Sequence, residues 1–296
     1  MGPFAKTFRY DTSGHWFKGN THLHSVKSDG GKTFSELASL YKSADYDFLF
    51  RTDHWVCSDT DDDKQNYPLM WLDGIELDGW DEKGKLFHVV CLGKVKGIHR
   101  EMGLDLAIKK AHQQDSLVIL AHPGWCGNEL ADCLQWEFDG VEIYNHVCHW
   151  LNGKSDGLSH WNYALSQNPN TLGFAVDDSH LTSGHPTWKG GWICVNTNHL
   201  SPSSIQAGIR AGNYYSSCGP EIKSLGFDGG SLHVETSPIQ YARLVGFRST
   251  GKVVGNIEGN LFDSFEIEIP TDWQYVYLEI EDNHHRRAWT NTLFSG

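Results

Sequence analysis

Along roughly the first 215 residues, short apolar runs of strand character alternate with stretches in which apolar residues recur with helical spacing. This alternation is typical of a parallel βα architecture, in which each strand is followed by a covering helix. The expected strands cover residues 16–24, 46–54, 74–77, 87–92, 117–122, 140–144 and 172–178, and the expected helices cover residues 33–43, 104–113 and 201–211.

From Glu221 onward, apolar and polar residues alternate one by one, and Gly, Asp or Pro separates the segments. Strict alternation indicates strands with one buried and one exposed face, as in antiparallel sheets. The segments cover residues 222–227, 231–236, 241–247, 264–269 and 275–281. We therefore expect two domains, with residues 1–220 forming an α/β domain and residues 221–296 forming a small, all-β, sandwich-like domain.

The composition fits a large folded core and no membrane span. The chain has 296 residues, 39% of them hydrophobic, and 12 tryptophans. Its longest apolar runs fall far below the roughly 18 residues that would cross a bilayer. The first residues lack the pattern of a signal peptide. Seven scattered cysteines without a CxxC pair resemble reduced packing residues, which disfavours cysteine ligation of metal and favours a cytoplasmic protein.

The net charge of −13 disfavours long nucleic acids as partners, because phosphate binding needs clustered Lys and Arg. Two or three bound divalent metals would add about +4 to +6 at one point and invert the local field. A small anionic, phosphorylated substrate is then compatible with the acidic chain. The sequence leaves the oligomeric state open.

The stretch GNTHLHSVKSDGG contains the first candidate chemistry. His22 and His24 are two apart, so on a strand their imidazoles point the same way at its C-terminal end. Asp29 follows in a turn that Gly30 and Gly31 allow to fold back toward the same point. Taken alone, the stretch favours a simpler interpretation, two surface histidines followed by an Asp-Gly turn.

Further histidines and carboxylates stand where other apolar runs end. His54 closes Thr-Asp-His, His122 lies in Ala-His-Pro, and Asp178 and His180 repeat the two-residue spacing. In a βα barrel the C-terminal ends of the strands carry the chemistry. These residues are therefore expected to converge.

At this point the chain resembles the PHP (polymerase and histidinol phosphatase) metal-dependent phosphoesterases. Their HxH with a following SDG, then TDH, AHP and DxH, stand here in the same order. Residues 16–21, 140–145 and 214–220 look like the CehA/McbA-type metallohydrolase branch, and the resemblance covers nearly the whole chain.

The resemblance implies a distorted, TIM-like (β/α)7 barrel with two or three metal ions at the C-terminal rim. His22, His24 and Asp178 would bind the first ion, and Glu76 would bridge it to the second. His88 and His122 would complete the second site. The implied third site consists of Asp29, His54 and His180.

Glu76 and His88 lie outside the short motifs and have simpler interpretations. Glu76 could be a solvated carboxylate in an acidic segment, and His88 a half-buried strand residue. We favour the ligand hypothesis because each lies beside an apolar run in the expected order, and two metal sites would otherwise lack ligands.

Imidazole and carboxylate ligands suit zinc, manganese or iron. Two such ions can hold a bridging hydroxide as nucleophile and stabilise the transition state, with no covalent enzyme intermediate. The expected catalytic residues are Glu76, Asp178, His180 and Asp53. Asp53 has the opposite strand parity to His54, so we expect it to orient a ligand histidine rather than to bind metal.

Three functions follow as hypotheses. The first is hydrolysis of a small phosphate monoester, diester or cyclic phosphate. The second is hydrolysis of a carboxylic or carbamic ester on the same metal centre, and the third is a non-catalytic binding module. His146, His149 and His185 are candidate proton donors to a leaving group.

Overall fold

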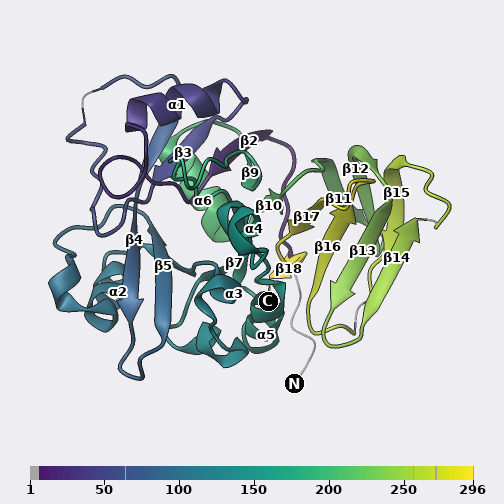
Figure 1. Cartoon of the computed structure of the whole chain (residues 1–296). Coiled ribbons are helices and arrows are strands. Elements are labelled where there is room, and N and C mark those ends of the chain that lie inside the picture. Colours follow the sequence, from purple (N-terminus) through teal and green to yellow (C-terminus); the bar gives the residue numbers. More distant parts are fainter. Residues whose placement is uncertain (1–6, 64, 256, 271, 296) are drawn as a thin grey trace.

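The computed structural model describes residues 7–63, 65–255, 257–270 and 272–295 (Figure 1). Residues 1–6, which were compared above with a signal peptide, lie outside this range. The described chain has a mixed α/β fold. Figure 1 shows helices packed around the first part of the chain and a lobe of strands formed by the C-terminal part.

The largest sheet orders thirteen strands of the described chain as β14-β13-β16-β17-β10-β9-β2-β3-β4-β5-β6-β7-β8. Its first strands along the chain are β2 (His15–Asn20), β3 (Phe48–Arg51), β4 (Met70–Trp80), β5 (Leu86–Leu92), β6 (Leu117–Leu120), β7 (Gly140–Asn145), β8 (Leu172–Val176), β9 (Trp192–Thr197) and β10 (Tyr214–Ser217). The C-terminal strands are β11 (Ile222–Asp228), β12 (Ser231–Ile239), β13 (Tyr241–Gly246), β14 (Gly251–Gly255), β15 (Phe262–Glu268), β16 (Val276–Glu281), β17 (Arg287–Thr290) and β18 (Phe294–Ser295), and β18 pairs with β1 (Thr7–Phe8).

The expectation of a purely parallel sheet is wrong at β5. Strands β2, β3 and β4 run parallel to one another, as do β6, β7 and β8. Strand β5 is antiparallel to both β4 and β6. The reason is the connection after β4, a short turn closed by a hydrogen bond from Asp81 N to Lys85 O, which leaves no room for the crossover that parallel pairing needs.

The segments that follow β2 and β8 lie side by side. Leu23 and Ser179 form a parallel bridge, flanked by hydrogen bonds from His24 N to Ser179 O and from Asp178 N to His22 O, both 2.9 Å long. Because these segments begin where the two strands end, the bridge brings together two of the motifs identified in the sequence.

The C-terminal strands form two groups. Strands β11, β12 and β15 make a separate three-stranded antiparallel sheet. Strands β13, β14 and β16 continue the main sheet through β17, which pairs with β10. The C-terminal part is therefore all-β, as expected, but the large sheet runs through it without a break.

The helices are α1 (Phe34–Lys42), α2 (Leu104–Gln113), α3 (Pro123–Cys126), α4 (His146–Asn152), α5 (Leu158–Gln167) and α6 (Pro202–Ala211), with 3-10 turns at Arg100–Met102 and Leu130–Leu134. The predictions for α1, α2 and α6 are confirmed. Local signals explain two of them. Thr33 and Glu36 form a capping box at the start of α1, and Ser201 caps α6 ahead of a proline in its first turn.

None of the helices in the described part of the chain combines the length and apolar character that crossing a lipid bilayer requires.

Candidate metal centre

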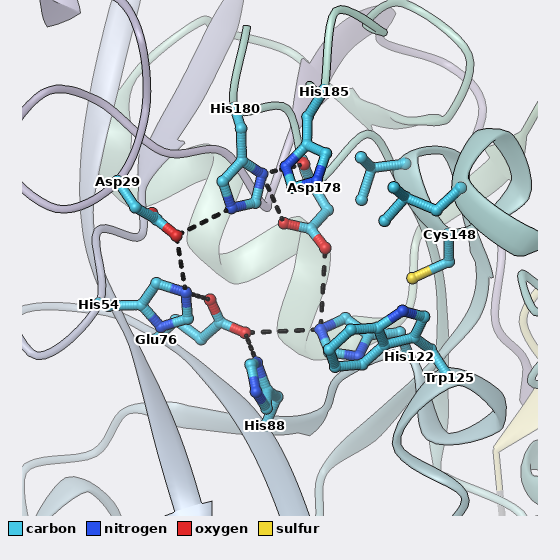
Figure 2. A pocket seen from close by; sticks show the side chains of 12 residues that line it. Asp29, His54, Glu76, His88, His122, Trp125, Cys148, Asp178, His180 and His185 are labelled. Atoms are coloured by element: carbon cyan, nitrogen blue, oxygen red, sulfur yellow. Dashed lines mark hydrogen bonds and ion pairs between the residues drawn. The ribbon is translucent and has the colours of Figure 1, made fainter. Parts of the chain in front are cut away.

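The nine residues expected as metal ligands come together in one place, around the carboxylates of Glu76 and Asp178. Figure 2 shows all of them except His22 and His24. They come from the segments after β2, β3, β6 and β8 and from the middle of β4 and β5. Three groups of them place ligand atoms within 4.8 Å of one another, a spacing at which they could hold a metal ion. These groups are His22, His24 and Glu76; His54, Glu76 and His88; and His24, Asp29, His54 and His180.

Glu76 lies at the middle of the cluster and is 1% exposed, so the interpretation as a solvated surface carboxylate is wrong. Its Oε2 atom is 3.2 Å from Nε2 of His22, 3.1 Å from Nε2 of His24 and 3.2 Å from Nε2 of His54. Its Oε1 atom is 2.8 Å from His88 Nδ1 and 3.5 Å from His122 Nε2.

Asp178 faces the same histidines from the other side. Its Oδ1 atom is 3.3 Å from His22 Nε2 and 3.2 Å from His24 Nε2, and its Oδ2 atom is 3.7 Å from His122 Nε2. The backbone of Asp178 has φ of 53°, in the left-handed region, and His122 also has a positive φ of 27°. Such conformations in non-glycine residues mark places where the surrounding structure holds the backbone in a costly shape.

The turn after His24 brings Asp29 to the cluster edge, 3.3 Å from His180 Nε2. The two glycines that follow are required by close packing. A Cβ at Gly30 would lie 2.2 Å from His24 O, and one at Gly31 would lie 2.5 Å from Leu181 O. These contacts explain why the sequence SDGG can fold back against both neighbouring segments.

The arrangement of ring nitrogens fits a bound cation better than direct hydrogen bonding. Glu76 Oε2 and Asp178 Oδ1 are buried, and neither receives a well-aligned hydrogen bond within the described chain. Nε2 of His22 and Nε2 of His24 face each other at 3.1 Å and face both oxygens. Lone pairs that converge in this way on a common point are the chemistry of a metal site.

The pKa shifts within the cluster also favour a bound cation. Burial alone would lower the pKa of His22, but Asp178, Glu76 and Glu142 raise that pKa well above its ordinary value. Burial would raise the pKa of Glu76, yet the surrounding imidazoles hold it well below its usual range. Because the carboxylates favour the charged form of the His22 ring, metal binding there would have to release a proton.

His54 shows the same effect at the edge of the cluster. Burial acts to lower its pKa, but the carboxylates of Glu76, Asp78 and Asp29 together raise the pKa to about 9.

Two carboxylates that the ligand prediction omitted hold the far sides of the rings. Glu142 is 1% exposed, accepts a 2.6 Å hydrogen bond from the His22 ring at Nδ1 and accepts another from the backbone N of His122. Asp78 lies 2.9 Å from Nδ1 of His54. Asp78 could have been found from its spacing, because it follows Glu76 by two residues on β4, as His24 follows His22. Glu142 lies in a stretch noted for the family resemblance, but no local pattern indicates its partner.

Asp53 does not touch a histidine ring. Its carboxylate accepts hydrogen bonds from the backbone N and Oγ of Ser25 and from Oγ of Ser28. Ser28 Oγ in turn lies 3.4 Å from His24 Nδ1. Asp53 therefore holds the turn that carries Asp29, and it reaches a histidine only through a serine. The alternation along the strand predicted that Asp53 points inward, but not that it binds serines.

The cluster forms one wall of a pocket of ≈ 160 Å³. Trp125, Val147, Cys148 and Leu151 from α3 and α4 form another wall, and His185 lies at the edge. Of the candidate proton donors, His185 lines this pocket, with its ring 5.3 Å from that of His180. His146 and His149 pack instead beside Tyr144.

No protein-family model matches the sequence, and no curated protein matches it either. Among solved structures, the fold is similar to that of a two-domain protein from Bacteroides vulgatus that contains a predicted PHP-like metal-dependent phosphoesterase. The TM-score is 0.53 at 13% identity, and the match covers 99% of this chain and 100% of the other.

Two weaker likenesses do not by themselves establish a shared fold. One is to a protein from Bifidobacterium adolescentis named for metal-dependent phosphoesterase activity, with a TM-score of 0.44, 12% identity and coverage of 57% of this chain and 90% of that one. The other is to an amidohydrolase from Chromobacterium violaceum, with a TM-score of 0.20, 17% identity and coverage of 57% and 56%. The Bacteroides match alone shows that this chain shares its overall fold with a two-domain protein over almost its full length.

Proposed function

We propose that this chain is a metal-dependent phosphoesterase of the PHP family that hydrolyses a small phosphate monoester, diester or cyclic phosphate. The observation that carries the proposal is the gathering of six histidines and Asp29 around the carboxylates of Glu76 and Asp178, whose buried atoms Glu76 Oε2 and Asp178 Oδ1 lack well-aligned donors within the described chain. The likeness in fold to a protein that contains a predicted PHP-like phosphoesterase agrees with it.

In this proposal His22, His24 and Asp178 would hold a first ion and His88 and His122 a second, with Glu76 facing both groups. Asp29, His54 and His180 would hold a third ion at the edge. Bound here, zinc, manganese or iron ions would activate water at neutral pH and stabilise negative charge on the reacting oxygen.

Three carboxylates behind these residues keep them in place. Glu142 accepts from Nδ1 of His22 and so directs Nε2 of that ring into the cluster. The Asp78 carboxylate lies 2.9 Å from Nδ1 of His54, on the far side of that ring from the cluster. Asp53 fixes the turn that presents Asp29.

We also propose that strands β2 to β8 form a barrel. Strands β2 to β8 are consecutive in the sheet, and the bridge between Leu23 and Ser179 joins the segments that follow the first and the last of them. We interpret this bridge as the closure of a distorted seven-stranded barrel, with the metal cluster at the rim where the bridge lies.

One observation favours a second candidate, the hydrolysis of a carboxylic or carbamic ester. Within the described chain, the lining of the pocket contains neither lysine nor arginine to contact a phosphate. A binding module without activity is disfavoured, because the buried oxygens and open pocket form a reaction site rather than a closed structural one.

The experiment measures metal content and turnover on the same preparation. Elemental analysis after gentle purification should find at least two transition-metal ions per chain. Initial rates on bis(4-nitrophenyl) phosphate, 4-nitrophenyl phosphate and 4-nitrophenyl acetate then compare three ester classes with one chromophore.

The proposal requires that a phosphate ester be turned over fastest and that His24→Ala abolish this turnover. His99→Ala, which changes an exposed histidine outside the cluster, is the matched control and should keep it. Less than one ion per chain after reloading with manganese or zinc would remove the basis of the proposal. A preference for the acetate would favour the second candidate.

A further inference from the structure

The pocket beside the candidate metal centre has a second wall without charge. It is formed by Trp125 of α3 and by Val147, Cys148 and Leu151 of α4. Figure 2 shows Trp125 and Cys148 on the side of the pocket away from Asp29. Leu151 is 38% exposed, so this wall continues to the surface.

Trp125 is held against the cluster itself. Its ring lies 5.3 Å from that of His122 and 5.6 Å from that of His88, nearly perpendicular to both. Helix α3 is fixed from behind, because a Cβ at Gly124 would come within 2.9 Å of Asp156 O. The indole therefore forms a rigid apolar surface next to the reacting position.

The opposite side of the cluster is polar. A groove of ≈ 400 Å³ there is lined by Ser28, Asp29, His54, Asp78, His88 and Arg100. Arg100 is held by two hydrogen bonds of 2.8 Å to the Asp78 carboxylate. Arg100, the one lysine or arginine among the residues lining the two hollows, is thus already paired and lies away from the Trp125 side.

We propose that the wall formed by Trp125, Val147 and Leu151 binds an uncharged apolar group of the substrate, an aromatic ring or a short alkyl chain attached to the hydrolysed ester. A charged or strongly hydrated group, such as a nucleotide phosphate or a sugar, would lose its hydration there with no polar partner. A cavity of about 150 Å³ holds benzene, so a pocket of ≈ 160 Å³ that also holds the reacting group accepts at most one ring.

This inference rests on the proposed function for the identity of the ester, but the apolar preference can be measured apart from it. Phenylphosphonate and methylphosphonate are stable phosphate mimics that differ only in the apolar group. Calorimetric titration into manganese-loaded protein should give a Kd at least about 10-fold lower for phenylphosphonate, because burying a ring removes apolar surface from water.

Two neighbouring residues of α4 provide a matched pair of variants. Leu151→Gln changes the wall and should reduce the preference for phenylphosphonate over methylphosphonate to about 3-fold or less. Trp150→Gln changes the adjacent residue, which is 48% exposed and outside the pocket lining, and should leave it unchanged. Trp125→Ala should reduce the preference at least as much as Leu151→Gln.

A second pair of probes separates this inference from the proposed function. Benzohydroxamate and acetohydroxamate bind metal centres without imitating phosphate. If neither phosphonate binds but Leu151→Gln selectively weakens benzohydroxamate, the apolar wall stands and the phosphoesterase proposal fails. The inference would be overturned if wild type, Leu151→Gln and Trp125→Ala all showed the same preference for the aromatic probe of each pair. It would also be overturned if none of the probes bound.

Discussion

At the scale of single residues, Glu76 and Glu142 show how two buried carboxylates of the same type take different roles. Both oxygens of Glu142 are occupied by donors, the His22 ring on one side and the His122 backbone N and Asn145 on the other. Glu76 Oε2 instead faces three ring nitrogens at 3.1–3.2 Å without a well-aligned donor in the described chain. Glu76 therefore keeps a free acceptor oxygen that faces the ring nitrogens, whereas both oxygens of Glu142 are taken up by donors, one of them the His22 ring.

This difference leads to a prediction for Glu76→Gln, which keeps the size of the side chain and removes its charge. The variant should lose second-site metal, and turnover should fall by roughly 10²-fold or more, because several kcal/mol of transition-state stabilisation come from the metal pair. Metal content, turnover and the unfolding midpoint should be measured on one preparation.

One result for Glu76→Gln would contradict a bridging role for Glu76. A Glu76→Gln protein that keeps two ions and near-normal turnover would show that Glu76 is not shared between them. Glu142 would then have to give up its present hydrogen bonds to serve as the shared ligand.

Residue-level prediction from sequence worked where the partner lies nearby and failed where it does not. Arg51 stands two residues before Asp53, a spacing that would allow an ion pair between them on one face of a strand. In the structure it pairs with Asp63 at 2.9 Å and lies over the rings of Phe34 and Trp71, because Asp53 turns inward to Ser25. Strand parity predicts which side of the sheet a side chain faces, but not which residue it contacts there.

At the scale of elements, the segment between β8 and β9 carries His180 and His185, and one buried carboxylate joins its two ends. Asp177 is fully buried and accepts hydrogen bonds from the backbone N atoms of Lys189, Gly190 and Gly191. It also accepts a 2.7 Å hydrogen bond from the Tyr41 hydroxyl on α1. The end of this segment is therefore tied to its beginning.

We predict that Asp177→Ala loosens this segment and depletes the ion held by Asp29, His54 and His180 before the others. Leaving one buried and two partly buried backbone donors without an acceptor should lower the free energy of unfolding by at least about 2 kcal/mol. Hydrogen exchange at residues 181–191 and metal content after dialysis provide the two measurements.

Tyr41→Phe is the matched control, because it removes one bond to Asp177 and leaves the three backbone donors satisfied. It should keep the full metal content and show little change in exchange. If Asp177→Ala kept all its metal with unchanged exchange in this segment, the role of the carboxylate as a clamp would be refuted.

At the scale of the whole molecule, the C-terminal strands are part of the packing of the first 220 residues. Asn291 accepts a 2.9 Å hydrogen bond from Gly173 N and donates to the carbonyl oxygens of Gly212 and Tyr214. The rings of Trp161 and Tyr277 lie 4.7 Å apart in one apolar cluster. The pairing of β17 with β10 covers an edge that would otherwise be open.

We propose residue 220 as the end of the metal-binding part and predict that truncation after Pro220 lowers stability and solubility more than metal content per folded molecule. The physical reason is the uncovered edge of β10 and the exposed apolar surface around Trp161. Soluble yield, unfolding midpoint and metal content of the soluble fraction test it.

A full-length variant keeps this prediction testable if the truncated chain does not fold. Asn291→Ala should lower the free energy of unfolding by about 1–3 kcal/mol, since it leaves buried groups unpaired, and should keep the metal. A soluble truncated protein of normal stability that lacks metal would contradict the assignment of the ligands to the first 220 residues.

The sequence by itself determined the parts of the molecule that depend on neighbouring residues. The capped helix α1, the alternating C-terminal strands and the histidines and carboxylates at strand ends all follow from turn chemistry and from the two-residue repeat of a strand. The resemblance to a known family then supplied the expected grouping of those residues.

Only the tertiary structure decided which side chains meet and what surrounds them. His22 and Glu142 are 120 residues apart, and the apolar wall joins residues of two short helices that no periodic pattern marks. Local patterns constrain a backbone over a few residues, whereas contacts between distant segments depend on how the whole sheet curves and packs, and that property belongs to no single stretch of sequence.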